Sequence, residues 1–405
     1  MTNPIETLYI CYFGLREPLV QTQVLPYLRE IAKAGYKVSL LTFEPKLRKS
    51  WSREQIAETR AELARSGIEW HLLAYHKRPS SIVTAWDILQ GVRFVRKKMR
   101  SGVSILHGRV HVATLMGALA RKLTSDKPKL IFDIRGFFPE EYVEAGVWPR
   151  DGLLYRAAKR VERWLVKESD GFVVLTQKAR EVFFPRDLAK PVEIIPCCVD
   201  FEKRFRTDED IRSPLEVTDR YVIAHVGALE GLYMADEIVA FLTAVRRRRP
   251  DLFALLLTQT DPQGITSSLQ ASGFTDKDYF VGRVSARDVP SYLKGARAGV
   301  SFVKATYATQ SRSPTKIPEY LAAGVPVIAN RGVGDVDKLI KQNHVGVLIE
   351  SFDESAYLRA FDELMSLKDI SERCRATAIR EFDLRTVGRS GYLRLYENVL
   401  KNGSR

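Results

Sequence analysis

Short apolar runs that alternate with helical stretches constrain the fold of this 405-residue chain more than any other feature. The runs TLYICYFG and KVSLLTFE flank VLPYLREIAKAG, a stretch with helical periodicity that ends at Gly35. The alternation continues through KLIFDIRG and GFVVLT, and a second series runs through LFALLLT, AGVSFVK and VPVIAN. Buried strands separated by helices predict a parallel sheet covered on both faces. Two such series predict two Rossmann-like α/β domains.

The chain turns polar and charged after Asp200, in the segment FEKRFRTDEDIRSPLEVTDR. A segment of this composition is typical of a linker. The chain has 405 residues, of which 45% are hydrophobic, and a chain of this length usually folds around more than one hydrophobic core. We therefore predict an N-terminal domain over residues 1–200 and a C-terminal domain over residues 201–380.

Positive charge is concentrated in the first of these domains. The net charge of the whole chain is +14, of which residues 1–200 contribute +11. The densest cluster is GVRFVRKKMR, from Gly91 to Arg100. Two interpretations stay open for it: a solvated helix face, or contact with an anionic membrane surface, to which each basic residue contributes about 1 kcal/mol. Nucleic acid is not expected as a partner, because no basic motif interleaved with aromatic residues supports it.

The sequence predicts no metal site and no cofactor. The four cysteines have neither paired metal-ligand spacing nor the pattern of a disulfide framework, which favours a reducing compartment. His107 and His111 lack the Glu of a His-Glu-x-x-His motif. The two Asp-x-Asp segments, DED at 208–210 and DKD at 276–278, resemble a metal-binding pattern but are interpreted as solvated loops. Neither a charged-then-apolar leader nor a run of about 20 apolar residues occurs, so we expect an intracellular protein.

The segment SRSPTKIPEYLAAGVPVIAN, residues 311–330, combines several functional signals. Ser311 and Ser313 are preferred N-cap types, and the prolines and the following glycine predict a short helix with a marked start and end. Whether this helix begins at Pro314 and bends, or begins only near Pro318, stays open. Unpaired backbone N–H groups at its start would bind an anion. The alternative is an ordinary capped helix that leads into a buried strand.

Three side chains of this segment are chemically suited to a nucleotide-sugar site. Lys316 adds a full positive charge to the anion site, and Arg312 would add another. A diphosphate leaving group requires such a fixed positive field, since its negative charge grows as the sugar departs. Glu319, further along the helix, is suited to accept hydrogen bonds from ribose hydroxyls. Together these residues predict binding of a nucleotide sugar.

The same segment resembles the donor-binding signature of retaining GT-B glycosyltransferases of glycosyltransferase family 4 (glycosyl transferases group 1). In that family a Glu-x7-Glu element precedes a Leu-Ala-x-Gly-x-Pro-Val-Ile segment. Glu319 corresponds to the second Glu, LAAGVPVI matches the segment, and Ser311 replaces the first Glu. Many members also place an Arg and a Lys on the diphosphate from the loop after the first C-terminal strand, but Val226–Glu237 has no basic residue here. The compensating charge is then expected from Lys316, Arg312 and Arg283.

Other segments extend the resemblance over most of the chain. FDIRGFFPEEYVEAGVW, from Phe132 to Trp148, is similar to the acceptor-side loop of the family. VEIIPCCVD, which ends at Asp200, resembles the boundary motif Ile-Pro-Asn-Gly-Val-Asp, with Cys197 and Cys198 in place of Asn and Gly. The resemblance implies the GT-B architecture: two Rossmann-like domains that face each other across a cleft. It also implies a C-terminal helix, over residues 381–405, that crosses back to pack on the N-terminal domain.

The resemblance gives the candidate site residues together with a general rule, that parallel sheets bind ligands at the carboxyl ends of their strands. The catalytic candidates are Lys316, Asp133 and Arg135. The donor-binding candidates are Gly227, Arg283, Ser311, Arg312, Ser313, Pro314, Thr315, Lys316 and Glu319. The acceptor-binding candidates are Gly14, Gln21, Gln23, His107, Arg109, Gly136 and Glu140. Phe137, Phe138 and Tyr142 are expected to line the same acceptor groove.

The resemblance implies a retaining, metal-independent hexosyltransferase-type enzyme. It would move a sugar from a nucleoside-diphosphate sugar to a hydroxyl of a glycan or lipid-linked acceptor, as in bacterial surface polysaccharide or lipid-linked glycan synthesis. The expected location is the cytoplasm, with peripheral contact at the inner face of the plasma membrane. Two alternatives stay open: a GT-B-fold nucleotide-sugar epimerase, which would convert the donor without an acceptor, and a non-catalytic partner subunit.

Overall fold

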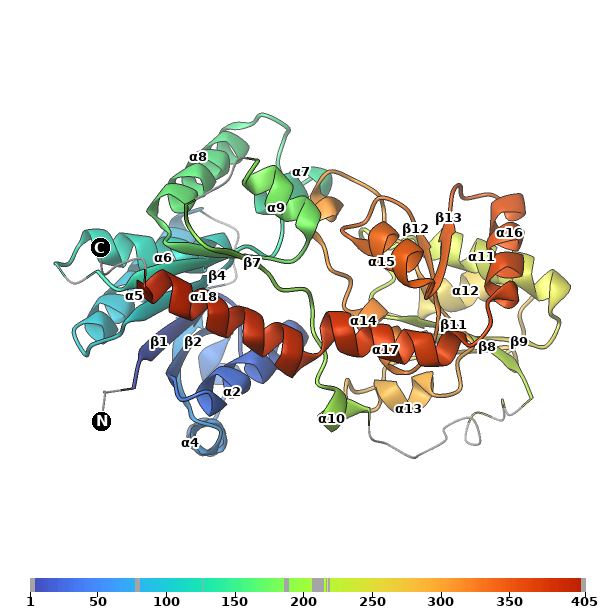
Figure 1. Cartoon of the computed structure of the whole chain (residues 1–405), viewed down its shortest axis with the longest axis horizontal. Coiled ribbons are helices and arrows are strands. Elements are labelled where there is room, and N and C mark those ends of the chain that lie inside the picture. Colours follow the sequence, from blue (N-terminus) through green and yellow to red (C-terminus); the bar gives the residue numbers. More distant parts are fainter. Residues whose placement is uncertain are drawn as a thin grey trace. The chain divides into compact units, whose positions relative to one another are not determined.

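The computed structural model of the chain describes residues 4–76, 81–125, 127–185, 189–205, 215, 217 and 219–401. The chain divides into two compact units (Figure 1). The N-terminal unit consists of residues 1–196 together with residues 388–405, and the C-terminal unit consists of residues 197–387. Each unit is built around one sheet with helices on its faces.

The sheet of the N-terminal unit has the strand order β3-β2-β1-β4-β5-β6-β7 in the described residues, and neighbouring strands pair in parallel. Its strands are β1 (Glu6–Cys11), β2 (Lys37–Pro45), β3 (Ile68–Tyr75), β4 (Ile105–Arg109), β5 (Lys129–Asp133), β6 (Gly171–Val174) and β7 (Val192–Ile194). The order of strands reverses at β1, which lies between β2 and β4. Open parallel sheets bind ligands beyond the carboxyl ends of their strands at such a point.

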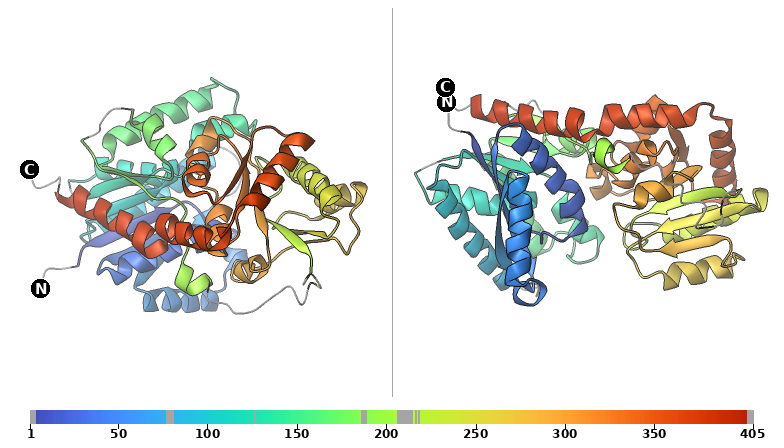
Figure 2. Two further views of the ribbon diagram at one scale, coloured as in Figure 1. Left: turned by 45° about the vertical axis from the view of Figure 1, so that its right-hand side comes forward. Right: turned by 90° about the horizontal axis from the view of Figure 1, so that it is seen from below.

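Helices lie on both faces of this sheet. They are α1 (Pro18–Gln23), α2 (Leu25–Lys33), α3 (Leu47–Ser50), α4 (Arg53–Arg65), α5 (Ser81–Met99), α6 (Val110–Lys122), α7 (Phe138–Glu144), α8 (Leu153–Glu168) and α9 (Gln177–Phe183). α2 and α4 lie on one face, and α5 and α6 pack together on the other (Figure 2). The start of α4 follows from a capping box, in which Ser52 and Gln55 each accept a hydrogen bond from the other's backbone N–H.

The last helix of the chain, α18 (Ser390–Lys401), belongs to the N-terminal unit and contacts β6 and β7. Gly171 of β6 permits this approach, because a Cβ atom at that position would lie 2.5 Å from Val399 Cγ1. The prediction that a C-terminal helix packs on the N-terminal domain is therefore confirmed, and the fold class of two parallel α/β domains is confirmed with it.

The sheet of the C-terminal unit has the strand order β10-β9-β8-β11-β12-β13 in the described residues, again parallel throughout. Its strands are β8 (Tyr221–Val226), β9 (Leu252–Leu257), β10 (Tyr279–Gly282), β11 (Ala298–Ser301), β12 (Val327–Asn330) and β13 (Gly346–Ile349). Its helices are α10 (Phe201–Arg204), α11 (Ala235–Arg248), α12 (Gln263–Ala271), α13 (Val289–Leu293), η1 (Ala308–Ser311), α14 (Lys316–Ala322), α15 (Val336–Asn343), α16 (Glu354–Ser366) and α17 (Ile370–Phe382). The segment η2 (Leu384–Arg389) leads into α18.

Alternate residues of the C-terminal strands pack on opposite faces of the sheet. In β8, Ile223 packs in one core with Phe241 of α11, whereas Val222 packs in the other core with Ile317 and Leu321 of α14. Burial on both faces explains why the strands read as continuous apolar runs in the sequence. It also fixes α14 firmly against the sheet, next to the carboxyl end of β8.

The start of α14 differs from both positions that the sequence left open. The helix begins at Lys316, with Thr315 as its N-cap, and Pro318 occupies its third position. The missing N–H of Pro318 costs nothing there, because the first four N–H groups of a helix have no partner within it. Pro318 therefore neither bends nor starts the helix.

Candidate functional site

The carboxyl ends of the C-terminal strands bring Gly227 and Lys316 together. Gly227 directly follows β8, and Lys316 opens the helix that follows β11 and η1. The backbone of Gly227 has a φ of +116°, and a Cβ atom there would lie 3.5 Å from the Lys316 Nζ atom. Glycine is required at this position by its backbone conformation, and it also leaves room for the lysine side chain.

Lys316 is a buried lysine without an anionic partner among the described residues. Its side chain is only 3% exposed. The Nζ atom lies 3.4 Å from His225 Nε2 and 4.4 Å from the centre of the Tyr233 ring. Within the described residues, no carboxylate forms an ion pair with it. Burial lowers the pKa of Lys316 to about 7, although the nearby Glu319 carboxylate acts in the opposite direction. A buried lysine of this kind favours an anion as its partner, and the described residues of the unit supply none.

His225 is neutral beside this lysine. Burial lowers its pKa well below the usual range, and the Lys316 charge lowers it further. Its Nε2 atom also lies 3.2 Å from the Ala228 carbonyl oxygen. Sequence reasoning missed His225 and Tyr233, although His225 lies only two residues before the strand-end glycine, Gly227. A polar residue so close to a strand end inside an apolar run is the signal that could have identified it.

The Glu319 carboxylate is already held by a guanidinium group. Arg204 Nη1 lies 2.6 Å from Glu319 Oε1, and Arg204 Nη2 donates to the Ala286 carbonyl oxygen at 2.7 Å. Two directed hydrogen bonds fix the guanidinium, which in turn fixes the carboxylate. Arg204 ends α10, in the segment that the sequence marked only as a linker. No sequence signal connects it with Glu319.

The two serines of the segment do not cap α14. The Ser311 hydroxyl is buried and donates to the Ala308 carbonyl oxygen at 2.7 Å, while the Ser313 hydroxyl accepts a hydrogen bond from the Cys197 backbone N–H at 3.1 Å. Expecting them as N-caps was wrong, because Ser311 is the last residue of η1 and the N-cap of α14 is Thr315. Of the remaining donor candidates, Arg312 and Pro314 are half-buried, and Thr315 and Arg283 are exposed.

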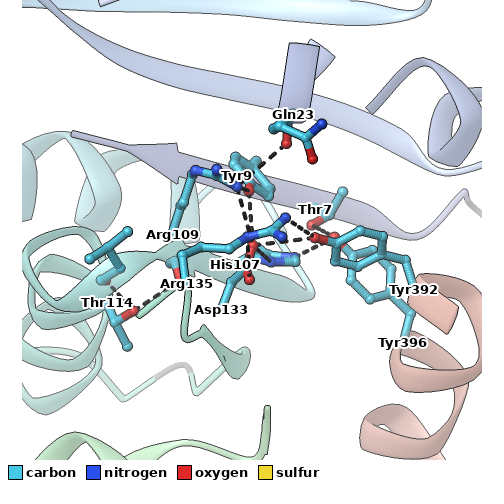
Figure 3. A network of polar contacts seen from close by, with 12 residues as sticks. Thr7, Tyr9, Gln23, His107, Arg109, Thr114, Asp133, Arg135, Tyr392 and Tyr396 are labelled. Carbon is cyan, nitrogen blue, oxygen red and sulfur yellow. Dashed lines mark hydrogen bonds and ion pairs between the residues drawn. The ribbon is translucent and has the colours of Figure 1, made fainter. Parts of the chain in front are cut away.

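Asp133 of the N-terminal unit lies at the centre of a buried network (Figure 3). Arg135 Nε lies 2.9 Å from its Oδ1 atom, and the Tyr9 hydroxyl donates to its Oδ2 atom at 3.1 Å. His107 Nε2 and Arg109 Nη1 lie 3.5 Å and 3.7 Å from the same oxygen. Burial alone would raise the pKa of Asp133, but the Arg135 charge first, then His107 and the Arg109 charge, outweigh it and hold the pKa well below its usual range. Asp133 is therefore an anion.

Two tyrosines of α18 complete this network. Tyr392 accepts a hydrogen bond from Arg135 Nη2 at 2.9 Å and donates to Asp133 at 3.3 Å. The Tyr396 hydroxyl lies 2.9 Å from His107 Nδ1. Four residues expected at the acceptor or catalytic site therefore meet one another, but their side chains are buried toward α18. Their roles in binding or catalysis stay predictions. The only sequence signal for the two tyrosines is their spacing of four, which places them on one helix face.

The other acceptor candidates shape loops at the strand ends. Gln21 Nε2 donates to the Leu15 carbonyl oxygen at 2.7 Å. The backbone carbonyl oxygen of Gln23 accepts a hydrogen bond from Arg109 Nη1 at 3.4 Å. Glu140 Oε1 lies 2.9 Å from Lys159 Nζ. Gly14 and Gly136 are tightly enclosed, since a Cβ atom would lie 2.8 Å from Pro45 and 2.6 Å from Glu141, respectively.

The aromatic residues expected in the acceptor groove divide into two environments. Phe137 is buried, whereas Phe138 and Tyr142 are more exposed and pack against Trp148 in edge-on and tilted orientations. The ring centres of Phe138 and Tyr142 are 4.7 Å apart, and those of Tyr142 and Trp148 are 4.6 Å apart. This partly exposed aromatic cluster follows β5 at the carboxyl edge of the sheet.

Of the two Asp-x-Asp segments, only 276–278 lies among the residues that the structure describes. No group of three or more His, Cys, Asp or Glu side chains there could hold a metal ion. Residues 208–210 lie outside the described residues. Asp278 is buried and paired with Arg220 and Arg246, so reading 276–278 as wholly solvated was wrong for this residue. Among the same residues, no helix is long and apolar enough to cross a membrane.

Two protein-family models match the chain along most of its length. Residues 20–198 match the glycosyl transferase 4-like domain, and residues 206–381 match glycosyl transferases group 1. A curated relative is the D-inositol 3-phosphate glycosyltransferase of Salinispora tropica, which is 25% identical over 224 residues. That alignment covers 50% of this chain but only 45% of the relative, so the chain matches less than half of the relative's length.

Solved structures share the fold over nearly the whole chain. A glycosyltransferase from Rickettsia africae is 16% identical with a TM-score of 0.72, covering 99% of this chain and 100% of its own. Sucrose-phosphate synthase from Thermosynechococcus elongatus is 15% identical with a TM-score of 0.74, covering 98% and 100%. Anabaena HepE, solved in complex with UDP and glucose, is 14% identical with a TM-score of 0.71, covering 97% and 100%. At these identities the similarity establishes a common fold.

Proposed function

We propose, because the chain belongs to the glycosyl transferases group 1 family, that it transfers a sugar from a nucleoside-diphosphate sugar to an acceptor hydroxyl. The observation that carries this proposal is the buried Lys316 ammonium without an anionic partner among the described residues. An unpaired buried charge is costly for folding and is retained where a ligand neutralises it.

A diphosphate fits this requirement better than a neutral sugar. Its charge would pair with Lys316, and the interaction strengthens as the sugar leaves and negative charge builds up on the diphosphate. Glu319, held by Arg204, would bind the ribose hydroxyls one helical turn away. Anabaena HepE, which shares the fold, was solved with UDP and with UDP-glucose. That finding concerns HepE itself, but it supports testing the same ligand class here.

We extend the proposal to the course of the reaction. The acceptor would attack from the face that the diphosphate leaves, so that the anomeric configuration is retained. No metal and no cofactor would be needed, because Lys316, Arg312 and Arg283 supply the positive charge. The acceptor would be a glycan or lipid-linked molecule held by the N-terminal unit, as in bacterial surface polysaccharide or lipid-linked glycan synthesis.

We also propose that the N-terminal unit contacts an anionic membrane through α8. Arg156, Arg160, Arg163 and Lys167 are all exposed and recur every three or four residues, so they form one stripe along the helix. Leu153, which begins α8, is 85% exposed, and Val147 in the preceding loop is 60% exposed. A basic stripe beside exposed apolar residues is the surface that anionic lipid attracts. In the 91–100 cluster, Lys98 is paired with Glu69, whereas Arg93, Lys97 and Arg100 are exposed.

Thermal stabilisation tests the donor site. The purified chain would be melted with UDP, GDP, ADP and their common sugar conjugates, in parallel with Lys316→Ala and with Lys277→Ala, which removes an exposed lysine at the opposite edge of the sheet. We expect one nucleotide to raise the melting temperature of the parent and of Lys277→Ala, but not of Lys316→Ala. No shift with any nucleotide would contradict the proposal and favour a non-catalytic subunit.

A further inference from the structure

The surface histidine at the end of β3 is oriented by a buried carboxylate. Asp87 of α5 is fully buried, while the side chain of His76 is 48% exposed. The His76 Nδ1 atom lies 2.6 Å from Asp87 Oδ1, and the His76 backbone N–H donates to Asp87 Oδ2 at 3.2 Å. The Tyr12 hydroxyl donates to the same Oδ2 atom at 2.8 Å. Three hydrogen bonds therefore lock this carboxylate and, through it, the imidazole ring.

The orientation of the ring leaves one nitrogen for another molecule. The tautomer that carries its hydrogen on Nδ1 donates it to Asp87 and presents the lone pair of Nε2. Asp87 satisfies groups of the protein itself, the Tyr12 hydroxyl and the His76 backbone, so its burial is explained by local structure. Among the described residues, no hydrogen bond or ion pair involves His76 Nε2. A fixed acceptor atom at an exposed ring edge is suited to a ligand that brings a donor group.

The position of this pair in the sheet favours a ligand. Tyr12 directly follows β1 and His76 directly follows β3, so both lie at the carboxyl edge of the N-terminal sheet. The half-buried Tyr12 ring lies 5.2 Å from the Tyr75 ring and 4.9 Å from the Phe43 ring, measured between ring centres. An apolar aromatic surface next to a hydrogen-bond acceptor suits a sugar, which carries apolar C–H faces and hydroxyl donors.

We propose that His76 binds the acceptor sugar, with its Nε2 atom accepting a hydrogen bond from a hydroxyl of a sugar that packs on Tyr12 and Tyr75. Asp87 is then the positioning residue that fixes the imidazole. This inference rests on the proposed function, since it assigns the acceptor side of the same reaction. His76 and Asp87 were not among the residues that the sequence suggested.

Nuclear magnetic resonance of the six histidines tests this directly in the full-length chain. His76 would be assigned by the loss of its signal in His76→Gln, and the exposed His344 of the C-terminal unit serves as the internal control. The probe is octyl β-D-glucoside below its micelle concentration. Its control is pentaethylene glycol monooctyl ether, which has the same tail without a sugar. Nucleotide-sugar binding would be measured separately on the same samples by thermal stabilisation.

We expect octyl β-D-glucoside to shift the His76 imidazole signals in a saturable way and to leave His344 unchanged, while the tail control shifts neither. Asp87→Asn should weaken the glucoside response about fivefold, as expected for one lost orienting hydrogen bond. The inference fails if His76 does not respond, or if the tail control moves it equally. It also fails if Asp87→Asn responds like the parent. Nucleotide binding is measured separately, so a failed histidine test would leave the proposed donor site unaffected. Absence of nucleotide binding would instead contradict the proposed function.

Discussion

At the scale of single residues, the pKa of Lys316 predicts how donor binding depends on pH. In the free protein, burial lowers this pKa to about 7, so the side chain is mostly neutral at pH 8. A bound diphosphate favours the ammonium form, and binding above pH 7 must therefore be accompanied by uptake of a proton. Affinity for a nucleotide sugar should then be greatest below about pH 7 and fall by roughly tenfold per pH unit above it.

Calorimetric titration with UDP-glucose, GDP-mannose and ADP-glucose between pH 6 and pH 9 would measure the slope of affinity against pH. Their diphosphates are doubly esterified and do not titrate in that range. Lys316→Arg is the matched control, because a guanidinium group stays charged and should remove the slope. If Lys316→Arg kept the slope of the parent, the titrating group would have to lie elsewhere.

The contact between Arg204 and Glu319 predicts that an Arg204 variant loses affinity only for ligands with ribose hydroxyls. Because Arg204 holds the Glu319 carboxylate, Arg204→Ala should weaken binding of a ribonucleotide about five- to tenfold. The same variant should bind the 2′,3′-dideoxy analogue as well as the parent does, since that analogue has no hydroxyls for Glu319. Arg287→Ala, an exposed arginine next to Ala286, is the control. Equal losses for both ligands would argue that Arg204 supports the fold and not the ribose contact.

At the scale of elements, the basic stripe of α8 predicts binding to anionic vesicles. Arg156→Glu/Arg160→Glu should reduce cosedimentation with vesicles of phosphatidylcholine and phosphatidylglycerol at least tenfold, because each basic residue near the surface contributes about 1 kcal/mol. Lys338→Glu/Lys341→Glu makes the same charge change on exposed positions of α15 and should have little effect. Equal binding by the two double variants would mean that vesicle binding depends on the net charge of the protein and not on the basic residues of α8.

The tyrosines of α18 predict a local effect on stability. Tyr392→Phe removes the hydroxyl that pairs with Arg135 and Asp133 in a buried network, which should cost about 1–3 kcal/mol. Hydrogen exchange should report faster opening of α18 amides, whereas Tyr142→Phe, at an exposed tyrosine, should leave them unchanged. Unaltered protection of α18 in Tyr392→Phe would show that the network does not hold this helix.

Elements differ in how far the sequence alone could place them. Strands such as β8 and β12 are buried on both faces and appear directly as apolar runs, so periodicity finds them. The start of α14 was missed because Ser311 belongs to η1 and does not cap the helix, and a short 3₁₀ turn has no periodicity of its own. Arg204 was missed because its partner, Glu319, lies 115 residues away in the sequence. Contacts across such separations depend on tertiary packing.

At the scale of the whole molecule, the order of apolar runs was sufficient to predict two parallel α/β domains. Composition could not show that Asp133, Arg135, His107 and Arg109 are buried together, because charged residues at strand ends are usually taken to be accessible. Their burial depends on α18, the last helix of the chain, which covers the N-terminal sheet at β6 and β7. The rule that ligands bind at the carboxyl ends of parallel strands therefore identified residues that contact one another. It could not show which of them are exposed to solvent.

The central claim is that the chain transfers a sugar using a donor bound at Lys316. The most direct measurement follows each nucleotide sugar of the panel by mass spectrometry and nuclear magnetic resonance with the parent, Lys316→Ala and Lys277→Ala, with octyl glycosides as acceptors. The account predicts that the parent and Lys277→Ala consume one donor and release its nucleoside diphosphate, and that Lys316→Ala is slowed at least a hundredfold. Full turnover by Lys316→Ala, or conversion of the sugar while it stays attached to the nucleotide, would contradict it.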